Sequence, residues 1–260
     1  MAWPGVDYHS HICESTIDAM LASAAEKGVC EYGISEHIFM LNEGHLVFPL
    51  VPEEGRRFTR QWYVETFRDR AQRSPMSIRL GLEVDYVPGT EVPVADVLAG
   101  VDWDFLIGSV HEIDGTDLFE YTPVDERDGQ MLWQRYYELS VAAIESGAFD
   151  VLAHPVRNMI RNPYVPEDVG DLLDAVATAA ARDGVALELN GEDTRLWPEM
   201  VTALAQAAGR AGCAVSLGSD AHRPETVAQS LLVASSIAAA AGVPGVVSFQ
   251  RRDRRILALD

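Results

Sequence analysis

The sequence predicts a single α/β domain in which parallel strands alternate with helices. Short β-rich runs are separated by longer amphipathic or apolar helical patterns, which is typical of repeated βα units. No linker, low-complexity segment or internal repeat interrupts the 260 residues, and one α/β barrel commonly has this length. Hydrophobic residues make up 48% of the chain, which is enough to bury a full core. We therefore expect one barrel of seven strand–helix units spanning residues 1–260.

The strands and helices follow from residue type and periodicity. The predicted strands are 5–11, 31–36, 77–85, 104–111, 149–154, 185–190 and 214–219. The predicted helices are 15–27, 54–73, 92–98, 128–146, 166–182, 198–211 and 226–241. The first helix opens with an S-x-x-D capping signature made by Ser15 and Asp18.

Three longer loops leave strand ends. Residues 38–53 include His45 and two prolines, and a loop of this length is either a functional lid or a surface excursion. Residues 114–127 form an acidic loop, and residues 156–166 carry Arg157 and Arg161. We treat His45 as a surface or lid residue.

Composition and charge exclude several classes of protein. The net charge of −20 argues against a broad nucleic-acid surface, which needs basic stripes. No apolar run approaches the roughly 18–20 residues of a membrane span, and the start of the chain lacks the basic region of a cleaved signal. Cys13, Cys30 and Cys213 are too few and too scattered for a disulfide framework. We expect a cytoplasmic protein that binds neither nucleic acid nor membrane; its oligomeric state stays open.

Six of the seven histidines lie at the ends of predicted strands, beside other residue types that bind metals. They are His9, His11, His37, His111, His154 and His222. Imidazole is the commonest neutral nitrogen ligand for zinc, iron and manganese. With Glu83 and Asp220, the set predicts a hydrolytic centre of several metal ions bridged by carboxylates. The alternative is that these residues are ordinary polar groups at strand ends.

The barrel explains why residues a hundred positions apart can form one site. Loops at the C-terminal strand ends of a barrel converge on one mouth. In the segment HSH, His9 and His11 are two residues apart, so both point to the same face of the strand. The apolar flanks of Glu83 favour a buried position, where metal ions compensate the charge. Glu36 is either an acceptor that orients an imidazole or a solvated flank, and Asn190 is a candidate polar lining residue.

The ordered set H-x-H, E-H, G-L-E, G-S-V-H, A-H-P and G-S-D-A-H resembles the polymerase-and-histidinol-phosphatase (PHP) family over the whole chain, nearest its monofunctional histidinol-phosphatase branch. The resemblance implies a distorted (β/α)7 barrel, similar to a TIM barrel, and two or three ions of zinc, iron or manganese. By this resemblance His9, His11, Glu83 and Asp220 bind the first metal. Glu83 bridges to a second metal, and a third metal has its own ligands. Those further ligands are His111 and His154 for the second metal, and His37 and His222 for the third.

One position departs from the family pattern. The family usually supplies a histidine or an aspartate from the loop after H-x-H, whereas this loop reads HSHICEST. Glu14 is the expected replacement ligand of the third metal. Its alternative role is that of a carboxylate favoured at a helix N-terminus.

Together these observations predict a metal-dependent phosphomonoesterase. Metal ions about 3.5–4 Å apart lower the pKa of a bridging water and clamp phosphate oxygens, so we expect a hydroxide between the first two metals to attack phosphorus. We expect Glu83, Asp220 and His222 to be catalytic. Arginines suit phosphate through bidentate geometry, and the candidates that bind the small phosphorylated substrate are Arg157, Arg161 and Arg223.

The resemblance implies L-histidinol phosphate as the substrate, within histidine biosynthesis. The loops at the mouth would favour a substrate with a positive amine through Glu43, His45, Asp114, Asp117 and Glu120. Three alternatives are a phosphatase for another small phosphate ester, an amidohydrolase-type enzyme and a non-catalytic PHP module. The carboxylated-lysine form of the amidohydrolase is excluded, because the only lysine, Lys27, lies at a predicted helix end.

Overall fold

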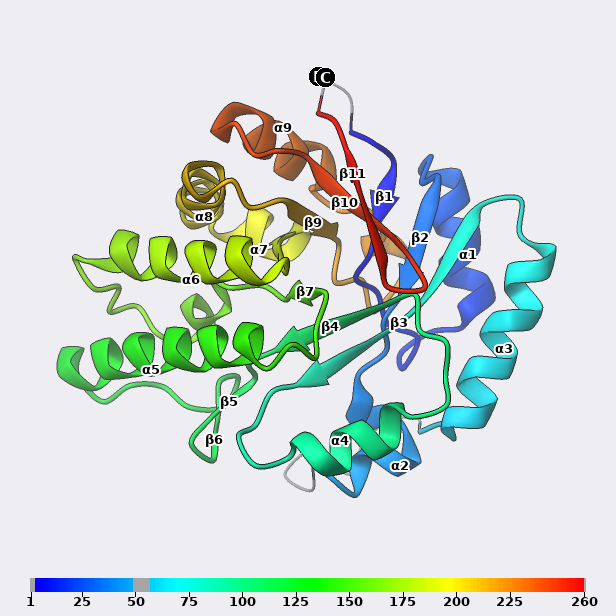
Figure 1. Ribbon diagram of the computed structural model, residues 1–260, viewed down its shortest axis with the longest axis horizontal. Coiled ribbons are helices and arrows are strands. Elements are labelled where there is room, and N and C mark those ends of the chain that lie inside the picture. The colour runs from blue at the N-terminus through cyan, green and yellow to red at the C-terminus, as the bar shows by residue number, and fades with distance from the viewer. Residues whose placement is uncertain (1–2, 49–56, 260) are drawn as a thin grey trace.

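The computed structural model describes residues 3–48 and 57–259. Its strands form a nine-stranded sheet in the order β1-β2-β3-β4-β7-β8-β9-β10-β11, and β5 pairs with β6 separately. All neighbours from β1 to β10 are parallel, whereas β10 and β11 are antiparallel. The α/β class with a mostly parallel sheet, predicted from the sequence, is confirmed (Figure 1).

Each of the seven predicted strands overlaps one observed strand, and the structure has further strands besides these seven among the described residues. The strands are β1 (Val6–Asp7), β2 (Glu31–Ile34), β3 (Ser77–Asp85), β4 (Phe105–Ser109), β5 (Glu112–Ile113), β6 (Thr116–Asp117), β7 (Val151–Leu152), β8 (Ala186–Asn190), β9 (Val215–Gly218), β10 (Val246–Gln250) and β11 (Asp253–Leu257). The hairpin of β10 and β11 was missed, because its second strand is largely exposed and rich in arginine.

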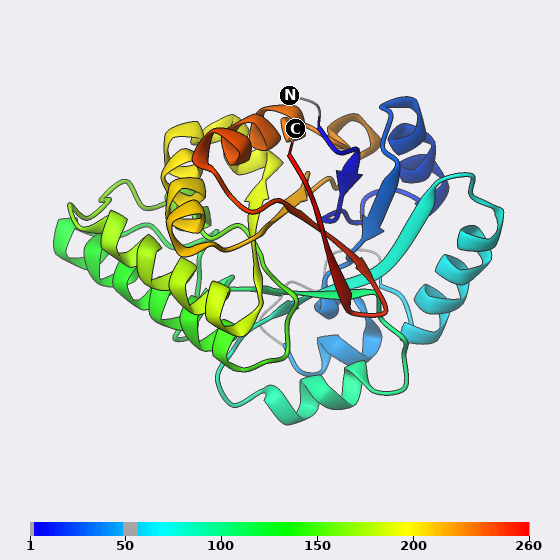
Figure 2. The same ribbon diagram turned by 45° about the horizontal axis from the view of Figure 1, so that its top comes forward.

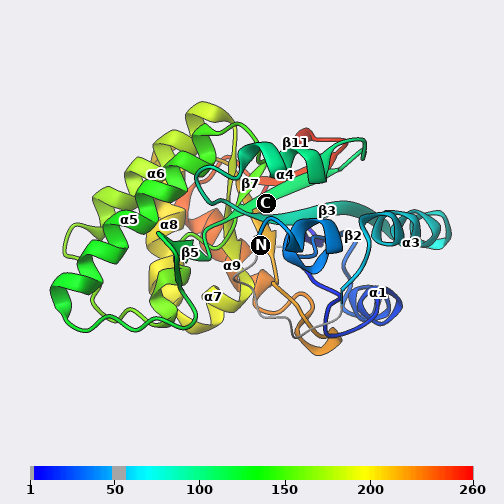
Figure 3. The ribbon, with the colours of Figure 1, turned by 90° about the horizontal axis from the view of Figure 1, so that it is seen from below.

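The helices lie on the outside of the sheet (Figures 2 and 3). They are α1 (Ile17–Glu26), α2 (Asn42–His45), α3 (Arg60–Arg73), α4 (Glu91–Leu98), α5 (Glu126–Glu145), α6 (Val169–Asp183), α7 (Gly191–Leu196), α8 (Pro198–Ala211) and α9 (Leu231–Ala241). The short 3-10 helices are η1 (Ile38–Met40), η2 (Arg157–Ile160) and η3 (Pro224–Thr226). Helices α5, α6, α8 and α9 pack against one another in succession.

Several predicted helix boundaries were wrong. Helix α1 is capped by Thr16, whose side chain accepts from the Ala19 backbone N–H, and not by Ser15. Helix α9 begins only at Leu231, because the backbone turns through positive φ at Ala228 and Ser230. The predicted loop 38–53 and helix 54–73 extend into residues 49–56, which lie outside the described residues.

Hydrogen bonds also join the chain after β1 to β9 and the residues beyond it. The backbone N–H of Tyr8 donates to Leu217 at 2.8 Å, and the N–H of Asp220 donates to His9 at 2.8 Å. Beneath this junction, the ring of Tyr8 packs edge-on against Phe105 at 5.0 Å between ring centres. The strand end that carries H-x-H is therefore held beside the strand end that carries Asp220.

Within the described residues, every helix is too short or too polar to span a bilayer.

Candidate metal centre

The structure brings the six predicted histidines, Glu83 and Asp220 together at the C-terminal ends of the parallel strands. Their ring nitrogens and carboxylate oxygens form four overlapping groups in which the ligand atoms lie within 4.8 Å of one another. The groups are His9–His11–Glu83, His9–His154–Asp220, His37–Glu83–His111 and His11–His37–His222. Because the groups share members, the eight side chains form one continuous cluster.

Glu83 lies at the middle of this cluster and is fully buried on β3. Its Oε2 lies 2.6 Å from His37 Nδ1 and 3.4 Å from His9 Nε2, and its Oε1 lies 3.1 Å from His154 Nε2. Burial alone would raise the pKa of Glu83, but the charges of His37, His9 and His111 outweigh it and hold the pKa well below 4.5. The predicted inward orientation of Glu83 is confirmed.

Asp220 faces the same space from the segment after β9. Its Oδ1 lies 3.2 Å from His11 Nε2 and 3.7 Å from His9 Nε2. The backbone of Asp220 has φ 57° and that of His154 has φ 29°. Residues other than glycine seldom adopt positive φ. Such strain persists only where the surrounding structure fixes it, and it is concentrated at functional sites.

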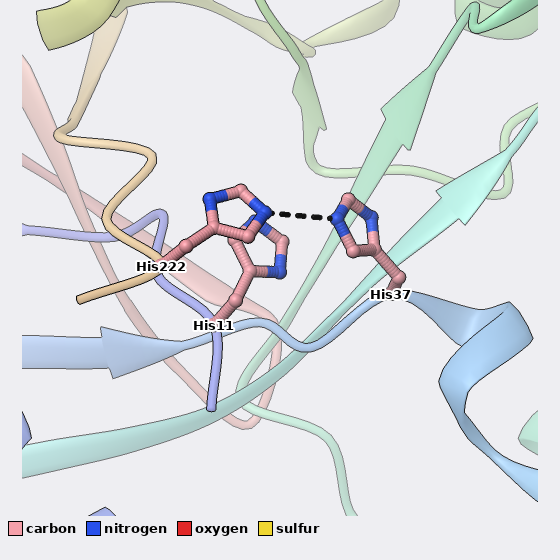
Figure 4. A group of neighbouring side chains, drawn as sticks. All are labelled: His11, His37 and His222. Carbon is pink, nitrogen blue, oxygen red and sulfur yellow. Dashed lines mark hydrogen bonds between the residues drawn. The ribbon is translucent and has the colours of Figure 1, made fainter. Parts of the chain in front are cut away.

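Figure 4 shows three of the clustered imidazoles, His11, His37 and His222. The rings of His11 and His222 stack at 4.2 Å between ring centres, and His222 Nε2 lies 3.3 Å from His37 Nε2. His222 Nδ1 lies 3.1 Å from the backbone oxygen of Asp220, which leaves Nε2 directed at the other rings. These three imidazoles form a group of nitrogen donors without a carboxylate.

Glu14 is not part of this group. Its side chain is about half exposed and accepts a hydrogen bond from Arg223 Nε at 2.8 Å on the surface. The structure therefore places neither Glu14 nor Arg223 among the residues that could hold an ion. His11 lies against His37 and His222 instead, which could not be predicted from the sequence because that contact depends on how distant strand ends meet.

Three carboxylates hold the ligand-type imidazoles from outside. Glu188 lies 2.8 Å from His9 Nδ1, Asp85 lies 2.6 Å from His111 Nδ1, and Glu36 lies 3.3 Å from His11 Nδ1. The predicted orienting role of Glu36 agrees with this contact. Glu188 and Asp85 were missed, although a signal existed: Asp85 follows Glu83 by two residues, and Glu188 precedes Asn190 by two, so each pair shares a strand face.

Of the three predicted arginines, the structure places only Arg157 at the centre. It is 6% exposed, and its guanidinium donates from Nε to Asp193 and from Nη2 to Asp220, each at 2.7 Å. Arg161 instead donates to the backbone oxygen of Phe119 from an exposed position. Asn190, the predicted polar lining residue, donates to Glu188 at 3.1 Å, behind the histidines.

The donor set fits divalent transition metals. His9 Nε2, His37 Nδ1 and Glu83 Oε2 are buried, lie 2.6 to 3.4 Å apart where they meet, and form no hydrogen bond with any described residue. Buried polar atoms are rarely left without a partner. Converging imidazole nitrogens and carboxylate oxygens suit zinc, iron and manganese, so these residues could hold such ions.

Part of the cluster lines a cavity of about 810 Å³, through His37, His111, His154, Asp220 and His222. Apolar side chains of Phe39 and Phe119 cover two of the histidines, with the Phe39 ring stacked on His37 at 4.5 Å and Phe119 at 5.4 Å from His111. The charged side chains that line the cavity beyond the histidines are Asp85, Glu112, Asp117, Glu120, Arg157, Glu192 and Asp220. The cavity wall beside the histidine cluster is therefore apolar and acidic.

The chain belongs to the PHP domain family, whose model matches residues 7–192. A probable histidinol-phosphatase of Deinococcus radiodurans is 39% identical over 163 residues, which cover 58% of this chain and only 60% of that protein. A probable phosphatase of Shewanella loihica is 27% identical over 227 residues, covering 84% of this chain and 77% of that protein.

The fold is also similar to a solved structure. The crystal structure of histidinol phosphate phosphatase from Lactococcus lactis, complexed with zinc, L-histidinol and phosphate, matches with a TM-score of 0.79 over 96% of this chain and 98% of that one. The two sequences are 19% identical, so this likeness shows the shared fold.

Proposed function

We propose that this chain is a metal-dependent phosphomonoesterase that hydrolyses L-histidinol phosphate to L-histidinol and phosphate. The observation that carries the proposal is the convergence of six imidazoles and two carboxylates in one cluster, part of which lines an 810 Å³ cavity with an acidic, apolar wall. Membership of the PHP family and the name of the Deinococcus relative support the reaction and the substrate.

The proposal includes closure of the sheet as a distorted (β/α)7 barrel in one domain spanning residues 1–260. The hydrogen bonds from Tyr8 to Leu217 and from Asp220 to His9, which link the first parallel strand to the seventh, support it. In a barrel the ligands from all strand ends face one mouth.

We assign two or three divalent ions of zinc, iron or manganese to the cluster, with Glu83 between neighbouring ions. When bound, such ions lower the pKa of a water molecule and neutralise phosphate oxygens. The chain's own contribution is to fix the ligands. Arg157 ties down one Asp220 oxygen, and the Asp220 backbone oxygen orients His222. We assign catalytic roles to Glu83, Asp220 and His222, which would hold the ions that act on the phosphate.

Arg157 is also the arginine that we assign to phosphate binding. It lines the cavity beside Asp220 and His154, and it is the arginine that lies in the cavity lining among the described residues. Arg161 and Arg223, whose side chains are exposed and bonded elsewhere, have no part in the proposed site.

The cavity wall supports a substrate with a positive amine and an apolar or aromatic body. Asp117 and Glu120, both predicted from the sequence, lie in this wall together with Glu112. The other predicted selectivity residues lie elsewhere: Glu43 accepts from the Arg60 backbone N–H, Asp114 pairs with Arg135 on the surface, and His45 is outside the lining.

The proposed partner is the small phosphorylated substrate alone, and the proposed pathway is histidine biosynthesis. The charge of −20 supports the absence of a nucleic-acid partner. The free thiols of the three cysteines support a reducing cytoplasm as the compartment.

A substrate panel tests the proposal. The protein is loaded separately with zinc, iron or manganese, and phosphate release is measured from L-histidinol phosphate, phosphoserine, glucose 6-phosphate and p-nitrophenyl phosphate. We expect histidinol phosphate to be hydrolysed with the highest kcat/KM. The variant Asp117→Asn with Glu120→Gln should raise KM for the amine substrate more than for the aryl phosphate, because it removes ground-state binding away from the chemistry. Asp114→Asn is the matched control outside the cavity.

The outcomes test the proposed reaction and the proposed substrate separately. Metal content below two ions per chain, after growth in metal-replete medium, would end the metal-phosphatase proposal. Hydrolysis of every monoester at similar rates would leave the phosphatase standing and favour another small phosphate ester as the substrate.

A further inference from the structure

Glu188 on β8 has no part in the ligand cluster, yet it touches two of its members. The side chain is 1% exposed, and its Oε1 accepts from His9 Nδ1 at 2.8 Å. Its Oε2 accepts from the backbone N–H of His154 at 2.8 Å and from Asn190 Nδ2 at 3.1 Å. One buried carboxylate therefore joins the ends of three strands behind the metal centre.

This contact determines which nitrogen of His9 is available. A carboxylate oxygen only accepts, so Nδ1 of His9 carries the proton and Nε2 is the atom that faces the cluster. That Nε2 lies 3.4 Å from Glu83 Oε2 and 3.7 Å from Asp220 Oδ1, and it has no hydrogen-bond partner among the described residues. The partner of the outer nitrogen fixes both the tautomer and the orientation of a ligating imidazole.

Gly218 gives an independent reason to regard the pair as built into the fold. A Cβ placed on Gly218 would overlap both Glu188 Oε1 and the Cβ of His9. The backbone of Gly218 is ordinary extended strand, so its conformation does not call for glycine. The residue is small because the His9–Glu188 pair occupies the space above it.

We propose that Glu188 is the positioning residue of His9: it holds the ring so that Nε2 is presented to the first metal ion. The inference rests on the metal centre proposed above. It makes no use of substrate contacts, since Glu188 lies behind His9 and outside the cavity lining.

The variant Glu188→Gln tests this because the surroundings dictate how the new amide must lie. Asn190 Oδ1 accepts from the backbone N–H groups of Glu192 and Asp193, so its Nδ2 is fixed as a donor toward position 188. Together with the His154 N–H, two donors face the former Oε2. The glutamine oxygen must turn to them, and its NH₂ group then meets His9 Nδ1, where a donor opposes a donor.

Two measurements read out the change. Zinc affinity, measured by competition with a chelator, should fall about 10–100-fold in Glu188→Gln, the usual cost of removing an outer partner of a metal-bound histidine. In the metal-free protein, the far-downfield proton signal of the His9 Nδ1–H, identified by its loss in His9→Gln, should disappear or shift. Asp104→Asn is the control: its carboxylate accepts two backbone N–H groups away from the cluster, and both readouts should match the wild type.

An unchanged Nδ1 proton signal in folded Glu188→Gln, or zinc affinity equal to the wild type, overturns the inference. If the wild-type protein itself binds none of zinc, iron and manganese, the proposed function fails, and the proton signal in the metal-free proteins still decides the role of Glu188.

Discussion

Replacing Arg157 with methionine is expected to destabilise the metal-free protein strongly. The guanidinium is buried and donates one hydrogen bond to Asp193 and one to Asp220, each 2.7 Å long. Methionine retains an unbranched apolar stem, so the substitution removes the charge and the two bonds while it preserves most of the packing. Two buried carboxylates then lose their nearest positive charge.

The expected size follows from these contacts. Removing one partner of a buried ion pair costs about 3–5 kcal/mol, because the other charge stays uncompensated. Burial already raises the pKa of Asp193 to about 7, so this carboxyl can take up a proton, and we expect the lower end of the range. At about 2–4 °C per kcal/mol for a chain of this size, a loss of about 3 kcal/mol lowers Tm by roughly 6–12 °C.

Thermal unfolding of the metal-free variants, followed by circular dichroism and calorimetry, measures the effect. Arg161→Met is the matched control, since its guanidinium bonds to the Phe119 carbonyl from an exposed position and its loss should change stability by at most about 0.5 kcal/mol. If Arg157→Met unfolds within about 2 °C of the control, the buried pairs do not carry the stability that we assign to them.

Three further results are expected. Glu14→Ala should leave the metal content unchanged, because Glu14 lies in a surface ion pair; loss of one ion per chain in elemental analysis would restore it as a ligand. Gly218→Ala should lower zinc affinity without removing a polar group, because the methyl group displaces Glu188, whereas Gly170→Ala, where the new Cβ meets nothing within 4 Å, should not; equal affinities would contradict the crowding argument. Removing metal with a chelator should lower Tm, because a metal ion present at a thousandfold excess over its Kd stabilises the folded state by about 4 kcal/mol; identical melting curves would show that the ions do not bind the folded state preferentially.

The fold could be predicted from the sequence where periodicity reports burial directly. The run from Ser77 to Asp85 is apolar except at Arg79, Glu83 and the strand ends, and its bounds were predicted correctly. The last hairpin could not be predicted in this way, because β11 exposes Arg254 and Arg255 and shows neither alternation nor an apolar run. Its pairing depends on β10, which the pattern did not distinguish from a loop.

The site could be predicted as a set of residues, but not as a set of contacts. Histidines at strand ends give a local signal, and the parallel topology brings them together whatever the details. Glu14 was expected beside His37 and His222 because the family draws that ligand from the loop after H-x-H, whereas in the structure His11 lies with these two histidines. That difference depends on where the segments after β1 and β9 meet, which short-range pattern does not encode. Glu188 was missed for a related reason, because its partner His9 is 179 residues away.

The charge balance of the interior gives the proposed metal centre a role in the stability of the fold. Among the described residues, Arg157 is the buried arginine or lysine, and it stands against seven buried carboxylic side chains. Those side chains are Asp7, Glu36, Glu83, Asp85, Glu188, Asp193 and Asp220. Burying carboxylates without compensating charge is costly, so the metal-free interior must take up protons, either on histidines or on the acids themselves. Two or three divalent ions would supply most of the missing positive charge at the point where the carboxylates converge. On this argument the residues that would hold the ions also make metal binding part of the stability of the fold.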